Sequence, residues 1–232
     1  GLIGRFGIGF VSVYQITDAP QISSGGIKIE LDPITEEVEE TIVHNSEGSK
    51  FELPFAFDAY SPVREALEAS PLMRSQIDTL AHDIGIVAET CLLFLRNLEQ
   101  VEVWRLGELK SKVTKSHRDD TTLKITFPLN SIDEHWYVIH FDASEKANVL
   151  KQKYPAIERL DRQTNGQIAF KLGQFEDRVG SLFAYLPTEQ ASPIPCHINA
   201  DFFPEQTRKA LVLSGEQHER YWNEMLLEVC AN

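Results

Sequence analysis

The sequence predicts an α+β protein built in two successive parts, and three observations support this fold class. Strand-like segments with alternating polar and apolar residues are joined by short turns, which is typical of antiparallel hairpins. Helical segments occur in both halves of the chain, without the regular alternation of strand and helix that marks a parallel sheet. The sequence changes character near residue 91, where a helix ends and a second run of strands begins. We therefore expect two domains, residues 1–91 and residues 92–232.

The first part begins with the glycine-rich stretch GLIGRFGIGF and a short helix. This helix ends before Pro20, because a proline disfavours the helical conformation of the residue before it. Three strands should follow as an antiparallel meander, since their apolar residues recur at every second position. They are GGIKIELDP, VEETIVHN and KFELPF.

Two helices then complete the first part. Ser61 and Pro62 are typical of an N-cap and a first helical position, and we expect that helix to end near Pro71. In the longer helix that follows, apolar residues at steps of three or four predict one buried face. They are Ile77, Leu80, Ala81, Ile84, Val87 and Cys91.

The second part is expected to alternate between groups of strands and single helices. Strands are predicted first in VEVWRL, TTLKITFPL and HWYVIHF, and a helix in SEKANVLKQKY. Further strands are predicted in QIAFKL, SLFAYLP and IPCHINADFF, before a closing helix in HERYWNEMLLEVCA. Hairpins dominate this part too, so the α+β assignment holds for both halves.

Net charge, cysteine spacing and hydropathy disfavour several classes of partner and location. The net charge is −13, from 35 acidic and 22 basic residues, and such a surface disfavours nucleic acid because it repels phosphates. The three cysteines, Cys91, Cys196 and Cys230, lack zinc-ligand spacing and are expected as free thiols of a reducing compartment. We find no signal peptide and no apolar run near the ~20 residues of a membrane span. A cytoplasmic protein without membrane contact is expected.

The glycine-rich stretch points to an anion. Gly4, Gly7 and Gly9 precede a helix, where free backbone N–H groups and the helix dipole favour a phosphate. The stretch lacks the Gly-Lys-Ser/Thr of a Walker loop, and its glycine order differs from the dinucleotide-binding fingerprint. The alternative is a tight turn that packs a helix onto a sheet.

Longer segments resemble a known family. IGRFGIGF with Val11 and Ser12 resembles a signature of the GHKL ATPases, most closely the ninety-kilodalton heat-shock chaperone branch and its sacsin-like relatives. Residues 17–20 (TDAP) and the segment LLFLRNLEQVEV are also similar to sacsin-type and bacterial relatives. So is LFAYLPTEQASPIPCHINADFFPEQTRKALVL, with Trp222 and Asn223 after it.

The resemblance implies a fold and a site. Residues 1–91 would be the C-terminal half of a GHKL (Bergerat) two-layer α/β sandwich that binds ATP, and residues 92–232 a middle-type α+β domain. At Arg5 the chaperones usually carry a different polar residue, so the role of that side chain is open. The residues implied to hold the β- and γ-phosphates of ATP at the lid hinge are Gly4, Arg5, Gly7, Ile8, Gly9 and Phe10.

In the chaperones a basic residue of the following domain reaches back to the γ-phosphate, where it stabilises charge developing in phosphoryl transfer. Arg208 and Lys209 are the candidates for this catalytic role, and Arg208 is favoured because its planar fork suits phosphate oxygens. The alternative is that both are solvent-facing charges beside a strand.

The resemblance also implies what these 232 residues lack. The family's catalytic Glu, its Mg²⁺-binding Asn and its adenine-reading Asp-x-Gly lie in an earlier segment that is not in this chain. We therefore expect the chain alone to bind ATP weakly or not at all, and not to hydrolyse it. The intact protein would be an ATP- and Mg²⁺-dependent, chaperone-like ATPase, with client proteins and a second copy of itself as implied partners.

Rival functions remain open, because one fold serves many functions. The domain could act as a nucleotide-gated interaction, signalling or defence module without chaperone activity, or as a scaffold that does not hydrolyse ATP. A GHKL protein of DNA repair is disfavoured, because its lid pattern differs and because this chain is acidic.

Two further clusters invite a chemical interpretation. Cys196 and His197 are neighbours on a predicted strand and point to opposite faces, so we expect a packed or hydrogen-bonded histidine rather than a catalytic pair. Asp119 and Asp120, with His117 nearby, could suggest a metal site, but we interpret them as a solvated loop and expect no resident metal there.

Overall fold

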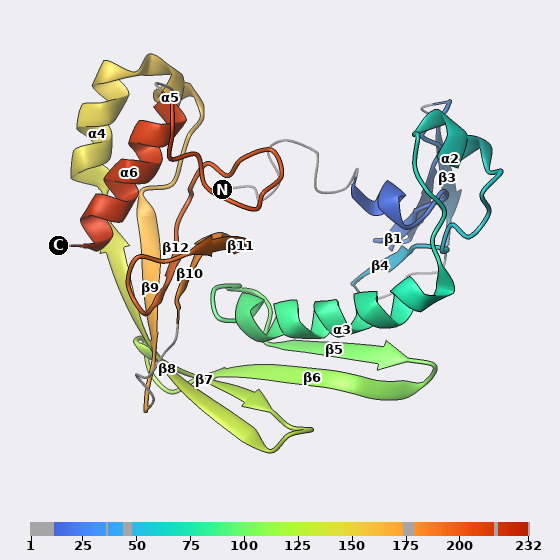
Figure 1. The fold of residues 1–232 in the computed structure, drawn as a ribbon, viewed down its shortest axis with the longest axis horizontal. Coiled ribbons are helices and arrows are strands. Elements are labelled where there is room, and N and C mark those ends of the chain that lie inside the picture. The colour runs from blue at the N-terminus through green and yellow to red at the C-terminus, as the bar shows by residue number, and fades with distance from the viewer. Residues whose placement is uncertain (1–11, 36, 44–47, 174–178, 216–217, 232) are drawn as a thin grey trace. The chain divides into compact units, whose positions relative to one another are not determined.

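The computed structural model describes residues 12–35, 37–43, 48–173, 179–215 and 218–231 (Figure 1). These residues contain two sheets and five α-helices, so the α+β class is confirmed. The chain divides into two compact units, up to Leu80 and from Ala81 onward, and the division falls inside helix α3 (Arg74–Cys91). None of the helices in the described ranges has the length and apolar character that a membrane crossing requires.

The first unit contains a four-stranded antiparallel sheet in the order β3-β2-β1-β4. Its strands are β1 (Gln21–Ser24), β2 (Ile27–Leu31), β3 (Val38–Ile42) and β4 (Ser49–Glu52). The expected three-stranded meander is wrong in two respects, because β1 was missed and β4 pairs with β1 instead of β3. Gly25 and Gly26, with φ of 59° and 85°, form the two-residue turn that joins β1 to β2 and leaves the outer edge of β1 for β4.

Two short helices flank this sheet in the chain. A 3₁₀ helix, η1 (Ser12–Gln15), precedes β1, where a short helix was expected before Pro20. Helix α2 (Pro62–Ala66) has the predicted proline at its start, but it ends before the expected stop near Pro71. Ser61 occupies the N-cap position without a capping hydrogen bond from its side chain.

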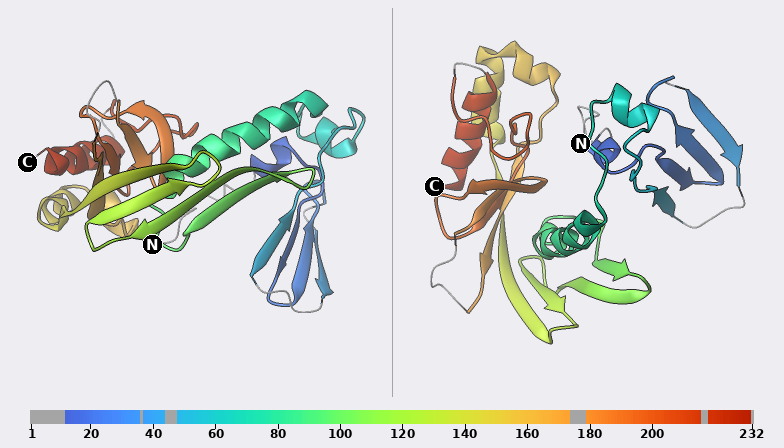
Figure 2. Two further views of the ribbon diagram at one scale, coloured as in Figure 1. Left: turned by 90° about the horizontal axis from the view of Figure 1, so that it is seen from below. Right: turned by 45° about the vertical axis from the view of Figure 1, so that its right-hand side comes forward.

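The second unit is built on an eight-stranded sheet in the order β11-β10-β12-β9-β8-β7-β6-β5 (Figures 1 and 2). Strands β5 to β9 form an antiparallel meander, and β12 lies between β9 and β10, parallel to β10. The strands are β5 (Gln100–Arg105), β6 (Glu108–His117), β7 (Thr122–Phe127), β8 (Ile132–Asp142), β9 (Asn165–Lys171), β10 (Ser181–Ala184), β11 (Leu186–Ala191) and β12 (His197–Asn199).

Alternating side chains of this sheet enter two separate cores. Leu182 and Ile198 belong to a core that also contains residues of α4 (Ser144–Lys153), α5 (Pro155–Arg159) and α6 (His218–Cys230). Their neighbour Phe183 points the other way, into a core closed by residues 92–94. Each face of the sheet is therefore covered in part, by the helices on one and by the turn after α3 on the other.

Helix α3 contacts the sheet through small residues. The predicted buried face is wrong in part, because Ile84 and Val87 are 47% and 46% exposed, whereas Gly85 and Ala88 are buried. A Cβ atom on Gly85 would lie 3.4 Å from Cβ of Ser111 in β6, so the helix backbone approaches that strand closely. Because glycine and alanine make this contact, the spacing of the large apolar residues in the sequence does not indicate it.

Candidate functional site

The residues implied to hold ATP phosphates lie outside the part of the chain that the structure describes. They are Gly4, Arg5, Gly7, Ile8, Gly9 and Phe10. Their role therefore stays a prediction, and the described structure begins with the helix η1 that follows them.

Arg64 of α2 holds the backbone directly after this glycine stretch. Its side chain is nearly fully buried, at 2% exposure, and donates hydrogen bonds to the carbonyl oxygens of Tyr14 and of Thr17, the latter at 3.0 Å. It also donates to a carboxylate oxygen of Asp18 at 2.5 Å. Thr17 in turn forms a β-bridge with Phe55. The chain is thus fixed at a point a few residues beyond the predicted phosphate-binding loop.

Arg208 lies in the loop of residues 200–212, which connects β12 to the segment before α6 and which we call the arginine loop. A bridge between Pro204 and Leu211 closes the loop, and the amide of Glu205 donates to the carbonyl of Ala210 at 2.9 Å. Arg208 has a φ of 59°, and its amide donates to the carbonyl of Glu205 at 2.9 Å. A non-glycine residue in this left-handed conformation is held there by its surroundings.

Side chains of helix α6 hydrogen-bond both ends of the arginine loop, at residues 201–203 and at residue 212. The side-chain oxygen of Asn223 accepts from the amide of Phe203 at 2.8 Å, and its amide group donates to the carbonyls of Phe203 and Val212 at 2.8 and 3.0 Å. The indole of Trp222 donates to the carbonyl of Asp201 at 2.9 Å. Both side chains are fully buried, so water does not compete for these bonds.

A buried ion pair also fixes the start of the arginine loop, at Asp201. Arg162 donates to the carboxylate of Asp201 at 2.5 Å, and the other oxygen of that carboxylate accepts from the amide of Gln163 at 2.9 Å. The guanidinium carbon of Arg162 also lies 3.6 Å from the ring centre of Phe203. Sequence reasoning missed these roles of Arg162 and Asp201. The detectable signal was an asparagine, Asn223, among the apolar residues of a predicted helix.

The structure separates the two basic candidates of the arginine loop. The ammonium of Lys209 forms an exposed ion pair with Glu189 at 2.9 Å. The guanidinium of Arg208 makes one long hydrogen bond, 3.4 Å, to the carbonyl of Ala184. Within the described ranges it has no carboxylate partner, so most of its donors stay available to a ligand. Whether either residue meets a phosphate stays a prediction.

His197 is a packed, hydrogen-bonded strand residue, as predicted. Its Nδ1 accepts from the amide of Ser181 at 3.0 Å, and its ring lies 5.3 Å from that of Trp136 and 5.4 Å from that of Phe183. Cys196 is buried, and this burial raises the pKa of its thiol to about 11. A thiol with so high a pKa is a poor nucleophile near neutral pH.

The acidic loop between β6 and β7 has a structural explanation. Asp119 accepts from the amides of Thr121 and Thr122 at 2.8 and 2.7 Å, and these bonds hold the pKa of its carboxyl below the ordinary value. Side chains that bind neighbouring amides in this way are common in tight turns. Across the described ranges, no group of three or more His, Cys, Asp or Glu side chains is placed to hold a metal ion.

Comparison with known proteins gives one similarity. A family model described as the Sacsin domain matches residues 1–66. No curated protein and no solved structure matches the chain. The match covers the glycine stretch, the four-stranded sheet and α2, and it supports the sacsin-like part of the resemblance. The wider relationship to GHKL ATPases and heat-shock chaperones stays a prediction, as does the assignment of an ATP-binding and a middle-type domain.

Proposed function

We propose that the chain is part of an ATP-binding and ATP-hydrolysing chaperone-like protein. In this proposal the glycine stretch holds the nucleotide phosphates. Arg208 contacts the γ-phosphate and stabilises the charge that develops there during hydrolysis. The similarity to the Sacsin domain over residues 1–66 supports the first half of the proposal. The geometry of the arginine loop supports the second.

The observation that carries the proposal is the guanidinium of Arg208, which has no carboxylate partner among the described residues and is presented by an anchored loop. Its one hydrogen bond within the described structure, to the carbonyl of Ala184, is long at 3.4 Å, so most of its donors can meet a ligand. The loop that presents Arg208 is fixed by Asn223, Trp222 and the ion pair of Arg162 with Asp201. A cation held in a fixed place without a counter-charge is well suited to stabilise charge on a ligand.

The donor set fits a nucleotide phosphate. The planar guanidinium of Arg208 offers paired N–H groups that match two phosphate oxygens, and the backbone amides of Gly4, Gly7 and Gly9 would offer further donors. ATP with Mg²⁺ supplies the phosphoanhydride bond whose hydrolysis would be coupled to movement between the two units. Client binding rests on the resemblance alone.

The test uses the protein expressed from its whole gene. ATP turnover and the affinity for fluorescent ATP and ADP analogues are measured for the unaltered protein, for Arg208→Ala and for Lys209→Ala. We expect Arg208→Ala to lower kcat by a factor on the order of a hundred or more, and to reduce the preference for ATP over ADP. Lys209→Ala removes a neighbouring charge already paired with Glu189, and it should change neither quantity by more than about twofold.

Different results point to different functions. Equal turnover in the unaltered protein and in Arg208→Ala would remove Arg208 from the proposal. Robust turnover by the 232 residues alone would contradict the expectation that catalysis needs an earlier segment. ATP turnover without suppression of aggregation of a heat-unfolded enzyme would favour an interaction or defence module. Binding without turnover would favour a scaffold.

A further inference from the structure

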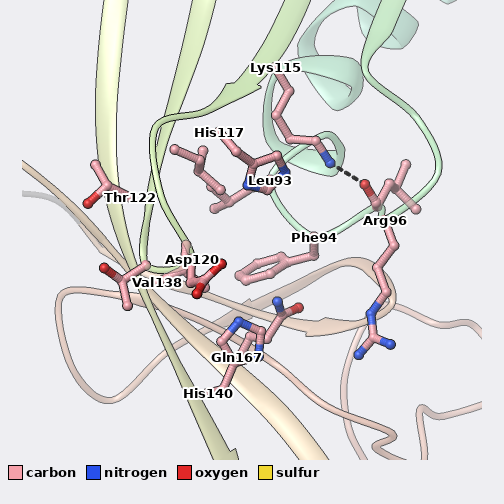
Figure 3. A pocket seen from close by; sticks show the side chains of 13 residues that line it. Leu93, Phe94, Arg96, Lys115, His117, Asp120, Thr122, Val138, His140 and Gln167 are labelled. Atoms are coloured by element: carbon pink, nitrogen blue, oxygen red, sulfur yellow. Dashed lines mark hydrogen bonds between the residues drawn. The ribbon is translucent and has the colours of Figure 1, made fainter.

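The second unit contains a pocket of about 290 Å³ between residues 93–96, which follow α3, and one face of strands β6 to β9 (Figure 3). Strand register explains why its lining residues share that face. His117 pairs with Leu123, and His140 pairs with Gln167, and directly opposed residues lie on the same side of a sheet. The volume equals that of roughly ten water molecules, which is enough for one ring and an acidic group.

The interior of the pocket is apolar. Leu93, Phe94, Leu123 and Val138 line it and are all buried in the second core. The ring of Phe94 lies near the middle of the lining side chains in Figure 3. A ligand body that packs here gains from leaving water, as is usual in small-molecule pockets.

A buried cation also lines this apolar space. Lys115 is only 7% exposed, and its ammonium donates one hydrogen bond, to the carbonyl oxygen of Leu95 (Figure 3). Lysine has three N–H donors, so two remain, and no carboxylate in the described ranges lies within ion-pair distance. A buried charge without a counter-charge is unfavourable. Burial correspondingly lowers the pKa of Lys115, and the more distant charge of Glu99 opposes this shift only in part.

The rim adds a second cation and two imidazole rings. Arg96, His117 and His140 line the pocket and are exposed, and Asp120 is the only carboxylate that lines it within the described structure. In the view of Figure 3 the Phe94 ring lies between Asp120 and the guanidinium of Arg96. Basic donors therefore outnumber the acidic group, on a chain whose net charge is −13.

We propose that this pocket binds a small organic anion. Its apolar body packs against Phe94, Leu123 and Val138, and its carboxylate or phosphate group supplies the missing counter-charge of Lys115, while Arg96 adds positive charge at the rim. Asp120 repels an acidic group placed near it and so favours the orientation in which that group lies at Lys115.

The test titrates the 232-residue chain with benzoate, phenyl phosphate and neutral benzyl alcohol, and follows the ring signals of His117 and His140 by NMR. We expect at least one of the two anions to bind about tenfold or more tightly than benzyl alcohol, because a hydrogen bond to a charged group contributes to binding. The tighter anion identifies the acidic group as a carboxylate or a phosphate. Lys115→Met keeps the apolar stem and should weaken that binding by about tenfold or more.

Lys110→Met is the matched control on the same strand. Lys110 pairs with Glu108 at 2.6 Å on the surface and does not line the pocket, so this variant should bind within about twofold of the unaltered chain. If Lys115→Met does not fold, Arg96→Gln on the exposed rim replaces it, with weaker anion binding expected. Equal binding of benzyl alcohol and the anions, no binding at millimolar concentration, or unchanged binding in the folded variant would overturn the proposal.

Discussion

The carboxamide of Asn223 hydrogen-bonds both the amide and the carbonyl of Phe203, which lies 20 residues earlier in the chain. The carbonyl of Phe203 also accepts from the amide of Val212 at 3.0 Å, whereas the amide of Phe203 is bound by Asn223. A third bond, to the carbonyl of Val212, joins the other end of the arginine loop to the same side chain. One buried residue of α6 therefore ties both ends of this loop to the helix.

Asn223→Ala should lower the free energy of unfolding of the second unit by about 3 kcal/mol. The substitution leaves the amide of Phe203 and the carbonyl of Val212 without their side-chain partner and removes one of the two donors to the carbonyl of Phe203, and each unsatisfied group costs about 1–3 kcal/mol. Urea unfolding monitored by tryptophan fluorescence measures the change. Asn130→Ala, in the exposed turn between β7 and β8, is the control and should stay within about 0.5 kcal/mol. Equal effects of the two substitutions would contradict the role given to Asn223.

Gly180→Ala should destabilise the second unit by about 2 kcal/mol or more. A Cβ atom at Gly180 would lie 1.8 Å from the carbonyl oxygen of Cys196, a backbone atom that moves only if β10 and β12 separate. Thermal unfolding followed by circular dichroism measures the shift. Gly85→Ala is the control, because its Cβ meets Ser111 at 3.4 Å and because alanine favours a helix. The interpretation fails if the two variants melt together.

Arg64→Met should destabilise the first unit by about 3–5 kcal/mol, because it leaves Asp18 and several carbonyls without their partner. Hydrogen exchange should become faster in the segment next to η1. Arg74→Met is the comparison, since Arg74 is exposed and its guanidinium lies over Phe57 at 5.0 Å. That variant should lose about 1 kcal/mol or less. Unchanged exchange in Arg64→Met would show that the segment is held by other contacts.

The three cysteines should react slowly in the folded chain. Burial raises the pKa of the thiols of Cys91 and Cys196 to about 11, and that of Cys230 to about 12. An unfolded cysteine ionises near pH ~8.5, so thiolates form in the unfolded chain first as the pH rises. The ionisation of the thiols therefore leaves stability unchanged below about pH 8 and lowers it as the pH rises from that value towards the folded pKa.

Two measurements check the cysteine prediction. Labelling with a chromogenic disulfide at pH ~8 should be much slower in buffer than in urea, because only thiolates react. Urea unfolding at neutral and at alkaline pH should give the lower stability at alkaline pH. A thiol that labels as quickly in the folded chain as in urea would contradict the burial of that residue.

Local patterns predicted many of the elements but not their partners. Alternation identified β2, β8 and β9, and the sequence around SEKANVLKQKY identified α4. The pairing of β4 with β1 and the insertion of β12 between β9 and β10 depend on contacts between distant segments, which periodicity does not encode. The buried line of α3 was misassigned because glycine and alanine make the contact there.

For the candidate site, the sequence predicted some of the residues but not the contacts that they make. Arg208 and Lys209 were identified by resemblance, but only the structure distinguishes them, because Glu189 and Ala184 are their partners across the fold. The ion pair of Arg162 with Asp201 joins residues 39 positions apart, and no local spacing indicates it. The role of the glycine stretch stays a prediction.

The position of β12 has a consequence for the order in which this unit is assembled. Strands β5 to β9 pair with their neighbours in the chain, so they can form while synthesis is still under way. Strand β10 cannot join them until β12, which is made later, has entered between it and β9. The arginine loop directly follows β12 and is anchored by α6, which is made later still. Arg208 therefore reaches its place only when α6 has left the ribosome, and a nascent chain that has not yet released α6 cannot present it.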